Sequence, residues 1–241
     1  MTSPAHRPPL EALLSAAART LPLRELGRSS QGRSVWGGRF GAPVVGPAVL
    51  VVGGVHGDEP AGVEAVLALA ERLRAPGAGA APTWLVPALN PDGLALGTKN
   101  SARDVDLNRN FPAASFRTAH APAYFPGAAP LSEPETRILA DLVDGEGVAA
   151  VVAVHAPFAC VNYDGPAEAW AAAVAQACGW PVRADIGYPT PGSLGSWLGL
   201  DRGLPVLTLE LPAGPYAGFR AQADAALDEA VRPRKHAPLV E

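Results

Sequence analysis

The sequence contains little cysteine. Cys160 and Cys178 are the only two among 241 residues. Two cysteines do not make a disulfide framework, and no CxxC pair indicates a zinc ribbon. Because stable disulfides are typical of secreted proteins, their scarcity favours a reducing compartment. We therefore expect a cytoplasmic protein whose stability depends on packing.

An excess of basic residues and a long apolar run are also absent. The chain has 19 Lys and Arg against 23 Asp and Glu, a net charge of −4, and its basic residues are scattered. That distribution argues against nucleic acid as a partner. No apolar run reaches the roughly 18 residues needed to span a bilayer. The start, MTSPAHRPPLEALLSAA, lacks the charged and apolar regions of a secretory signal. We expect no membrane partner.

Glycine and proline do not reach the level typical of disorder. The chain has 26 of each, about a fifth of its residues, which is below the content of a disordered low-complexity protein. A chain of 241 residues is long enough to bury one large core. We predict a single domain over residues 1–241.

Apolar runs alternate with helical patterns along the chain. Continuous runs rich in valine predict buried strands, and apolar residues spaced three and four apart predict helices. The predicted strands cover 35–40, 48–54, 83–90, 147–155 and 204–212, and the predicted helices 10–21, 61–74, 131–143, 167–179 and 217–231. The alternation predicts an α/β fold, a three-layer α/β/α sandwich.

Two segments between these elements carry further signals. Ser132 and Glu135 have the S-x-x-E spacing of a helix capping box, which explains both residues without catalysis. The segment from Leu94 to Pro130 has little periodicity. Since a compact domain seldom contains so long a loop without a purpose, we predict a functional surface loop.

Two of the five histidines, His56 and His155, stand directly at the carboxyl ends of apolar runs. Open α/β sheets place their ligand sites at that edge. Either histidine alone is compatible with a structural hydrogen bond, but two at equivalent positions favour a metal site. Glu59 lies three residues after His56 and can reach the same ion. A His, Glu, His set leaves a fourth position open, as catalytic zinc requires.

Glu210 ends a run that is otherwise made of Leu, Val and Thr. It could simply emerge into solvent at the end of a strand. A buried glutamate would instead have a raised pKa and could serve as a general base beside a metal. The residues of this strand leave both interpretations open.

Six features occur in the order found in zinc metallocarboxypeptidases: HGDE, NPDG, VDLNRNFP, SEPET and the strand-terminal His155 and Glu210. The chain resembles this family from about Val51 to Pro212, and VDLNRNF combined with H-x-x-E is highly specific. The text NPDGLALGTKNSARDVDLNRNFP, with LSEPET and GYPTPGSLGSW, is most similar to the murein peptide amidase branch. The resemblance implies a mixed, mostly parallel twisted sheet. It also implies hydrolysis of the γ-D-glutamyl to meso-diaminopimelate bond in cell-wall peptide recycling.

The resemblance further implies a role for each matching residue. It makes His56, Glu59 and His155 the ligands of one zinc ion per chain and Glu210 the catalytic base. The other implied roles are the orientation of His56 by Asp106, the binding of the substrate carboxylate by Asn108 and Arg109, closure over substrate by Tyr188, and stabilisation of the oxyanion by Arg103, with Lys99 as the alternative. Asp104 stands where this branch has glycine, which adds a carboxylate beside Arg103.

Two rival functions remain compatible with the sequence. One is an N-acyl amino acid deacylase similar to succinylglutamate desuccinylase or aspartoacylase, which share a GGxHG type of turn. The other is a member that binds peptides without cutting them. The NPDG to VDLNRNFP block and SEPET favour the peptidase over the deacylase, and the complete set of ligands and base argues for catalysis. We therefore expect a small muropeptide-derived peptide as the substrate, while the oligomeric state stays open.

Overall fold

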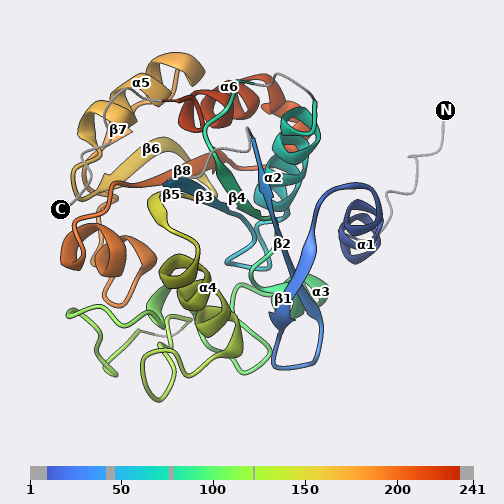
Figure 1. Ribbon diagram of the computed structural model, residues 1–241. Helices are drawn as coiled ribbons and strands as arrows, with labels where there is room; N and C mark the ends of the chain where they lie inside the picture. Colours follow the sequence, from blue (N-terminus) through green and yellow to red (C-terminus); the bar gives the residue numbers. More distant parts are fainter. Residues whose placement is uncertain (1–9, 42–46, 76–78, 122, 234–241) are drawn as a thin grey trace, which may run out of the picture.

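An eight-stranded mixed sheet runs through the protein (Figure 1). The computed structural model describes residues 10–41, 47–75, 79–121 and 123–233. The strand order is β1-β2-β4-β3-β5-β8-β6-β7. Four central strands, β4, β3, β5 and β8, are parallel, and β2 and β6 flank them in the antiparallel direction. The strands are β1 (Arg24–Arg28), β2 (Ser34–Phe40), β3 (Ala48–Val52), β4 (Thr83–Val86), β5 (Val148–His155), β6 (Phe158–Asp164), β7 (Val182–Arg183) and β8 (Val206–Pro212).

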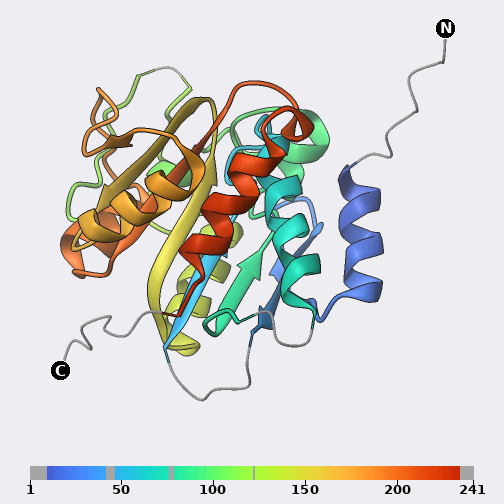
Figure 2. The same cartoon turned by 90° about the horizontal axis from the view of Figure 1, so that it is seen from above.

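Helices cover both faces of this sheet (Figure 2). One face packs against α2 (Pro60–Leu73), α5 (Glu168–Cys178) and α6 (Arg220–Ala230). The other face packs against α4 (Pro134–Gly145) and the π-helical segment η2 (Gly195–Asp201). The remaining helical elements are α1 (Leu10–Thr20), α3 (Pro91–Leu96), η1 (Leu107–Arg109) and η3 (Tyr216–Gly218). The predicted three-layer α/β/α sandwich with a mostly parallel sheet is confirmed.

The valine-rich strands fill two cores, one on each face of the sheet. On β3, Val51 belongs to the core under α2, whereas Leu50 and Val52 belong to the core under α4. Side chains alternate between the faces of a strand. A strand with helices on both sides therefore needs apolar residues at every position, which explains the continuous apolar run in the sequence.

Several predicted boundaries differ from the structure. The predicted strand at 83–90 ends at Val86, because the chain turns there and enters α3. Strands β1, β6 and β7 were not predicted. The short strands β1 and β7 are largely exposed and have no apolar run that would indicate a strand. Residues 1–9, on which the prediction of no secretory signal partly rests, lie outside the described residues. No helix in the described part of the chain is long and apolar enough to cross a membrane.

The predicted capping box is wrong. Helix α4 begins at Pro134, with Glu133 as its N-cap. Proline fits the first helical position because its φ is already near the helical value and its missing N–H would have no partner there. The hydroxyl of Ser132 instead donates to Glu133 Oε1 at 3.1 Å, and Glu135 Oε1 accepts a hydrogen bond from the backbone N–H of Ser30 at 3.0 Å.

One buried amide holds the long loop before α4. Asn110 is fully buried. Its Oδ1 accepts hydrogen bonds from the backbone N–H of Glu133 and the hydroxyl of Thr136, at 3.2 and 2.7 Å. Its Nδ2 donates to the carbonyl oxygens of Pro126 and Ala129, at 2.7 and 3.0 Å. Both ends of this side chain are needed, so only an amide suits the position.

We predict that Asn110→Asp destabilises the fold. The change replaces a donating amide by an oxygen that faces two carbonyl oxygens, and each unmet buried polar group costs about 1 to 3 kcal/mol. The free energy of unfolding in urea should fall by about 3 kcal/mol. Gln176→Glu, the matched control at an exposed position of α5, should change it by less than about 0.5 kcal/mol. Equal effects of the two changes would contradict the role of Asn110.

Candidate zinc site

The turn after β3 packs directly on helix α3, which follows the neighbouring parallel strand β4. A Cβ on Gly57, after β3, would lie 2.0 Å from the carbonyl carbon of Gly93, after β4, so only glycine allows this approach. The backbone N–H of Gly57 and the side chain of Asn90 both donate to the carbonyl oxygen of Lys99, at 3.2 and 3.3 Å. These two hydrogen bonds therefore fix the backbone of Lys99 beside the HGDE turn.

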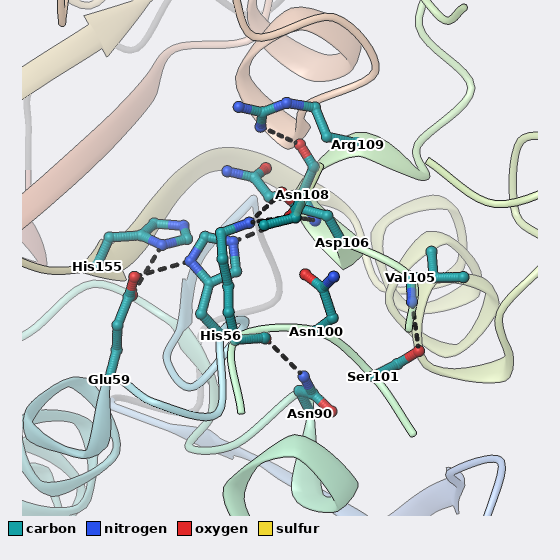
Figure 3. Close-up of polar contacts among 12 residues, drawn as sticks. His56, Glu59, Asn90, Asn100, Ser101, Val105, Asp106, Asn108, Arg109 and His155 are labelled. Atoms are coloured by element: carbon teal, nitrogen blue, oxygen red, sulfur yellow. Dashed lines mark hydrogen bonds and ion pairs between the residues drawn. The ribbon is translucent and has the colours of Figure 1, made fainter. Parts of the chain in front are cut away.

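His56, Glu59 and His155 point toward one another at the carboxyl ends of β3 and β5 (Figure 3). His56 Nδ1 lies 2.8 Å from Glu59 Oε1, and His155 Nδ1 lies 3.1 Å from Glu59 Oε2. One ligand atom from each residue lies within 4.8 Å of the others. The structure thus brings together the three residues that the sequence predicts as metal ligands.

This donor set fits zinc. Two imidazoles and one carboxylate are a ligand combination of catalytic zinc, which keeps a further position open. Burial alone would lower the pKa of His56, but hydrogen bonds with Asp106 and Glu59 raise it to about 9. Burial alone would raise the pKa of Glu59, but His155 and His56 lower it to about 2. The cluster therefore favours positive charge between its carboxylates, and a divalent cation supplies that charge.

Asp106 connects the cluster to the long loop. The residue is fully buried. Its Oδ1 lies 3.2 Å from His56 Nε2 and accepts a hydrogen bond from the backbone N–H of Asn108 at 2.9 Å. Its Oδ2 forms an ion pair with Lys99 Nζ. Burial alone would raise the pKa of Asp106, but the hydrogen bond with His56 lowers it. An ionised Asp106 orients the imidazole so that Nδ1 faces Glu59.

The short helix η1 presents two further predicted site residues. Asn108 Oδ1 accepts a hydrogen bond from the backbone N–H of Leu194 at 3.0 Å. Arg109 is 5% exposed, and its Nη1 donates to the carbonyl oxygen of Asn108 at 2.7 Å. The guanidinium carbon lies 5.2 Å from the centroid of the Tyr124 ring. These contacts hold the cationic group of Arg109 at a fixed place beside the cluster.

A cavity of about 730 Å³ lies over His56, Glu59 and His155. That volume suits a small-molecule or short-peptide ligand. Most of the predicted site residues line it, namely His56, Glu59, Asn108, Arg109, His155, Tyr188 and Glu210, and so does Lys99. Tyr188 is 38% exposed at the edge of the cavity, with its ring centroid 6.4 Å from those of Tyr124 and Phe158.

Glu210 is a buried carboxylate in this cavity. It is 5% exposed and stands opposite His155 in the pairing of β8 with β5. Its Oε2 is buried without a hydrogen-bond partner among the described residues, and burial raises the pKa of this carboxyl group. Of the two interpretations left open by the sequence, emergence into solvent is excluded.

The structure places Arg103 outside the cavity. Its side chain is 58% exposed, and its Nε lies 3.9 Å from Glu133 Oε2. Lys99 lines the cavity instead, with Nζ 4.6 Å from the centroid of the Tyr124 ring. Of the two candidates, Lys99 lines the cavity and Arg103 does not.

The substitution of glycine by Asp104 has a structural explanation. Asp104 has a φ of 61°, in the left-handed region that favours glycine but that aspartate also adopts. Its carboxylate Oδ1 and its carbonyl oxygen accept hydrogen bonds from Asn100 Nδ2 at 3.1 and 3.2 Å. Asp104 thus keeps the backbone turn of a glycine, and its carboxylate binds Asn100.

Several cavity residues carried no signal in the sequence, and Tyr124 and Asp164 are among them. Tyr124, which lies over Lys99 and Arg109, belongs to a loop without periodicity. Asp164, the last residue of β6, also lines the cavity, and no motif includes it. A prediction of β6, as a continuation of the sheet after His155, could have placed Asp164 near the site.

Comparison with known proteins agrees with this geometry. The family model described as zinc carboxypeptidase matches residues 10–169. Murein peptide amidase A of Escherichia coli (strain K12) is 35% identical over 216 residues, which cover 80% of this chain and 86% of that protein. Murein peptide amidase A of Vibrio campbellii (strain ATCC BAA-1116) is 34% identical over 177 residues, which cover 68% of each chain.

Solved structures share the fold. The murein-tripeptide amidase of Escherichia coli O157 superimposes with a TM-score of 0.74 at 31% identity, over 89% of this chain and 93% of that one. A carboxypeptidase A from Helicoverpa armigera matches with a TM-score of 0.73 at 20% identity, over 91% and 70% of the chains. Because the family model spans well over half of the sequence, the chain belongs to the zinc carboxypeptidase family and is a zinc metallopeptidase.

Proposed function

We propose that the protein is a murein peptide amidase that hydrolyses the amide bond between γ-D-glutamate and meso-diaminopimelate. The observation that carries this proposal is the meeting of the zinc-ligand cluster, the unpartnered carboxylate of Glu210 and the fixed guanidinium of Arg109 in one cavity. The relatives named murein peptide amidase support the substrate class. Cys160 and Cys178 are buried and free, which supports a cytoplasmic location for the protein. The proposed role is in cell-wall peptide recycling, and we propose that residues 1–241 form one catalytic domain.

In this proposal His56, Glu59 and His155 hold one zinc ion. When bound, zinc would act as a Lewis acid and would lower the pKa of water from about 15.7 toward about 7. The contribution of the protein is to set the ligands in place before substrate arrives. Asp106 does so for His56 through Nε2, which leaves Nδ1 free to act as a ligand.

Glu210 acts as the general base. Its Oε2 is buried and accepts no hydrogen bond from the described residues, so this oxygen is available to take a proton from the attacking water. The same carboxyl group then returns the proton to the amine of the leaving amino acid. A neighbour that donated to Oε2 would compete with this transfer, and no described residue does so.

Lys99 stabilises the negative charge that develops on the amide oxygen. Its ammonium group lines the cavity, and a fixed cation in a site shielded from water stabilises such charge strongly. Asp106 and the ring of Tyr124 hold the ammonium group in place. Arg103 is too exposed for this role, and its guanidinium group lies near the carboxylate of Glu133 instead.

Arg109 and Asn108 bind the free carboxylate of the leaving amino acid. A guanidinium group presents several N–H donors in one plane and suits a carboxylate. Only Nη1 has a backbone acceptor, the carbonyl oxygen of Asn108, in the hydrogen bonds of the described residues, so other donors of the group can serve the substrate. Tyr188 at the edge of the cavity closes over the bound peptide.

The direct test uses zinc-loaded protein and the tripeptide L-alanyl-γ-D-glutamyl-meso-diaminopimelate. Mass spectrometry should detect L-alanyl-γ-D-glutamate and free meso-diaminopimelate. Removal of zinc with a chelator should abolish the reaction, and added zinc should restore it, because the cluster has no other group that can replace the Lewis acid. Hydrolysis of N-acyl amino acids in place of the tripeptide would favour a deacylase, and zinc binding without any turnover would favour a peptide-binding protein.

Glu210→Gln separates catalysis from metal binding. Glutamine keeps the shape of the side chain but cannot accept a proton, so kcat should fall about 100-fold to 10,000-fold. Zinc content and thermal stability should stay near those of the unmodified protein, whereas His56→Ala should lose zinc. An active, zinc-replete Glu210→Gln protein would refute the role of Glu210, and loss of zinc from it would make Glu210 a metal ligand.

Lys99 and Arg103 are distinguished by a matched pair of variants. Lys99→Ala should lower kcat about 100-fold to 1,000-fold, the usual cost of removing a group that stabilises an oxyanion. Arg103→Ala removes an equal charge from an exposed position and should change kcat by no more than about twofold. Zinc content, measured in both variants, checks that the cluster is intact. The opposite order of effects would return the role to Arg103.

A further inference from the structure

A second cavity, of about 340 Å³, adjoins the catalytic cavity. Arg109, Tyr124 and Tyr188 line both cavities and form the boundary between them. The rest of the wall comes from the loop after η1, which includes Arg117, and from two prolines that follow Tyr188. A ligand that extends past the three shared residues therefore enters a separate space.

The described residues that line the second cavity include cations and no carboxylate. Arg109 and Arg117 supply two guanidinium groups, and His120 supplies an imidazole. The catalytic cavity differs, because carboxylates such as Glu59 and Glu210 line it. Two like charges on the wall of one small cavity repel each other, and an anion bound beside them offsets that repulsion. The lining therefore suits an anionic ligand.

Arg117 is the cation that is available to bind such a ligand. The residue is exposed, and its guanidinium group forms no hydrogen bond or ion pair with another residue in the described part of the chain. Arg109, by contrast, donates from Nη1 to the carbonyl oxygen of Asn108 at 2.7 Å. A guanidinium group without acceptors presents all of its N–H donors in one plane, which suits a carboxylate.

Apolar and aromatic surfaces make up most of the remaining wall. Tyr124 and Tyr188 stand where the two cavities meet, with their ring centroids 6.4 Å apart. Pro126, Pro189 and Pro191 line the second cavity as well. Apolar surfaces of this kind bind the carbon chain of a ligand, whereas a few polar groups fix its orientation. A carboxylate on a short aliphatic chain suits this combination better than a bare inorganic anion, which would leave the apolar surfaces uncovered.

The ring of Tyr124 relates the second cavity to the reaction centre. Lys99, which we place at the amide oxygen of the substrate, has its Nζ 4.6 Å from the centroid of this ring. The same ring lines the second cavity, which therefore begins beside the amide under attack. In a γ-linked glutamyl group the α-carboxylate stands four carbon–carbon bonds from the amide carbonyl carbon, about 5 Å in an extended chain. It is the one anionic group of the proposed substrate on the acyl side of the scissile bond.

We propose that the second cavity binds the α-carboxylate of the γ-linked D-glutamyl group through Arg117. The inference rests on the proposed function, and it adds how the enzyme recognises the acyl side of the scissile bond. An acyl group whose α-carboxylate is amidated has nearly the same size but no charge at that place. The enzyme therefore favours γ-glutamyl groups with a free α-carboxylate over amidated ones.

The test compares two tripeptides that differ only on the acyl side. One is L-alanyl-γ-D-glutamyl-meso-diaminopimelate, and the other carries an α-carboxamide in place of the α-carboxylate. In the unmodified protein kcat/KM should be about tenfold higher for the first peptide, because the carboxamide loses a charge-assisted hydrogen bond. Arg117→Met should lower kcat/KM for the first peptide about tenfold and for the second by less than about twofold. Equal losses on both peptides, or no loss on either, would overturn the assignment.

A control variant and two further measurements exclude indirect effects. Arg232→Gln removes an equal charge from a side chain that is 67% exposed and paired with Glu229. It should leave kcat/KM for both peptides unchanged, and a loss of the preference in this variant would make net charge, and not Arg117, the cause. Arg117→Met should keep the zinc content and melting temperature of the unmodified protein. If it does not fold, Arg117→Gln replaces it in the same comparison.

Calorimetry separates this inference from the proposed function. L-alanyl-γ-D-glutamate and L-alanyl-D-isoglutamine, which differ only in the α-carboxylate, are titrated into the zinc-loaded protein and into Arg117→Met. A preference for the α-carboxylate that the variant loses, without hydrolysis of the tripeptide, would refute the proposed reaction and keep the role of Arg117. Hydrolysis without such a preference would refute the role of Arg117 alone. Absence of both would overturn both.

Discussion

The arrangement of the site depends on the contacts of one buried carboxylate, that of Asp106. It binds three groups from different parts of the chain, the imidazole of His56, the ammonium group of Lys99 and the backbone N–H of Asn108. An unpaired carboxylate at this depth would be very unfavourable, so the three partners and Asp106 stabilise one another's positions. The long loop and the strand-end cluster therefore adopt their places together, although the loop has little regular structure of its own.

The parallel strands supply the second constraint. Neighbouring parallel strands end at one edge of the sheet, so residues nearly a hundred positions apart, such as Glu59 and His155, meet there through their side chains. The apolar strands behind them are buried on both faces, and that packing fixes the edge. A loop-based cluster would have to order its ligands at the moment of metal binding.

Part of the site could be predicted because its signals are local. His56, Glu59 and His155 stand at the ends of apolar runs, and the NPDG and VDLNRNFP segments are contiguous. The choice between Lys99 and Arg103 could not be made from the sequence, because it depends on which side chain the loop directs into the cavity. The predicted capping box was wrong because α4 begins at Pro134, whose fixed φ suits the first helical position. Glu133, and not Ser132, is therefore the N-cap residue.

The cavity holds two glutamates with different protonation properties, and their surroundings explain the difference. Glu59 lies between His56 and His155, which lower its pKa, so it stays ionised, as a metal ligand must be. Glu210 has no donor for Oε2 among the described residues, and burial raises its pKa, as proton transfer requires. Carboxylates whose environments move their pKa values apart can perform separate tasks in one site. The fold achieves this by placing Glu59 at the start of α2, between the two imidazoles, and Glu210 near the end of β8, where it is buried.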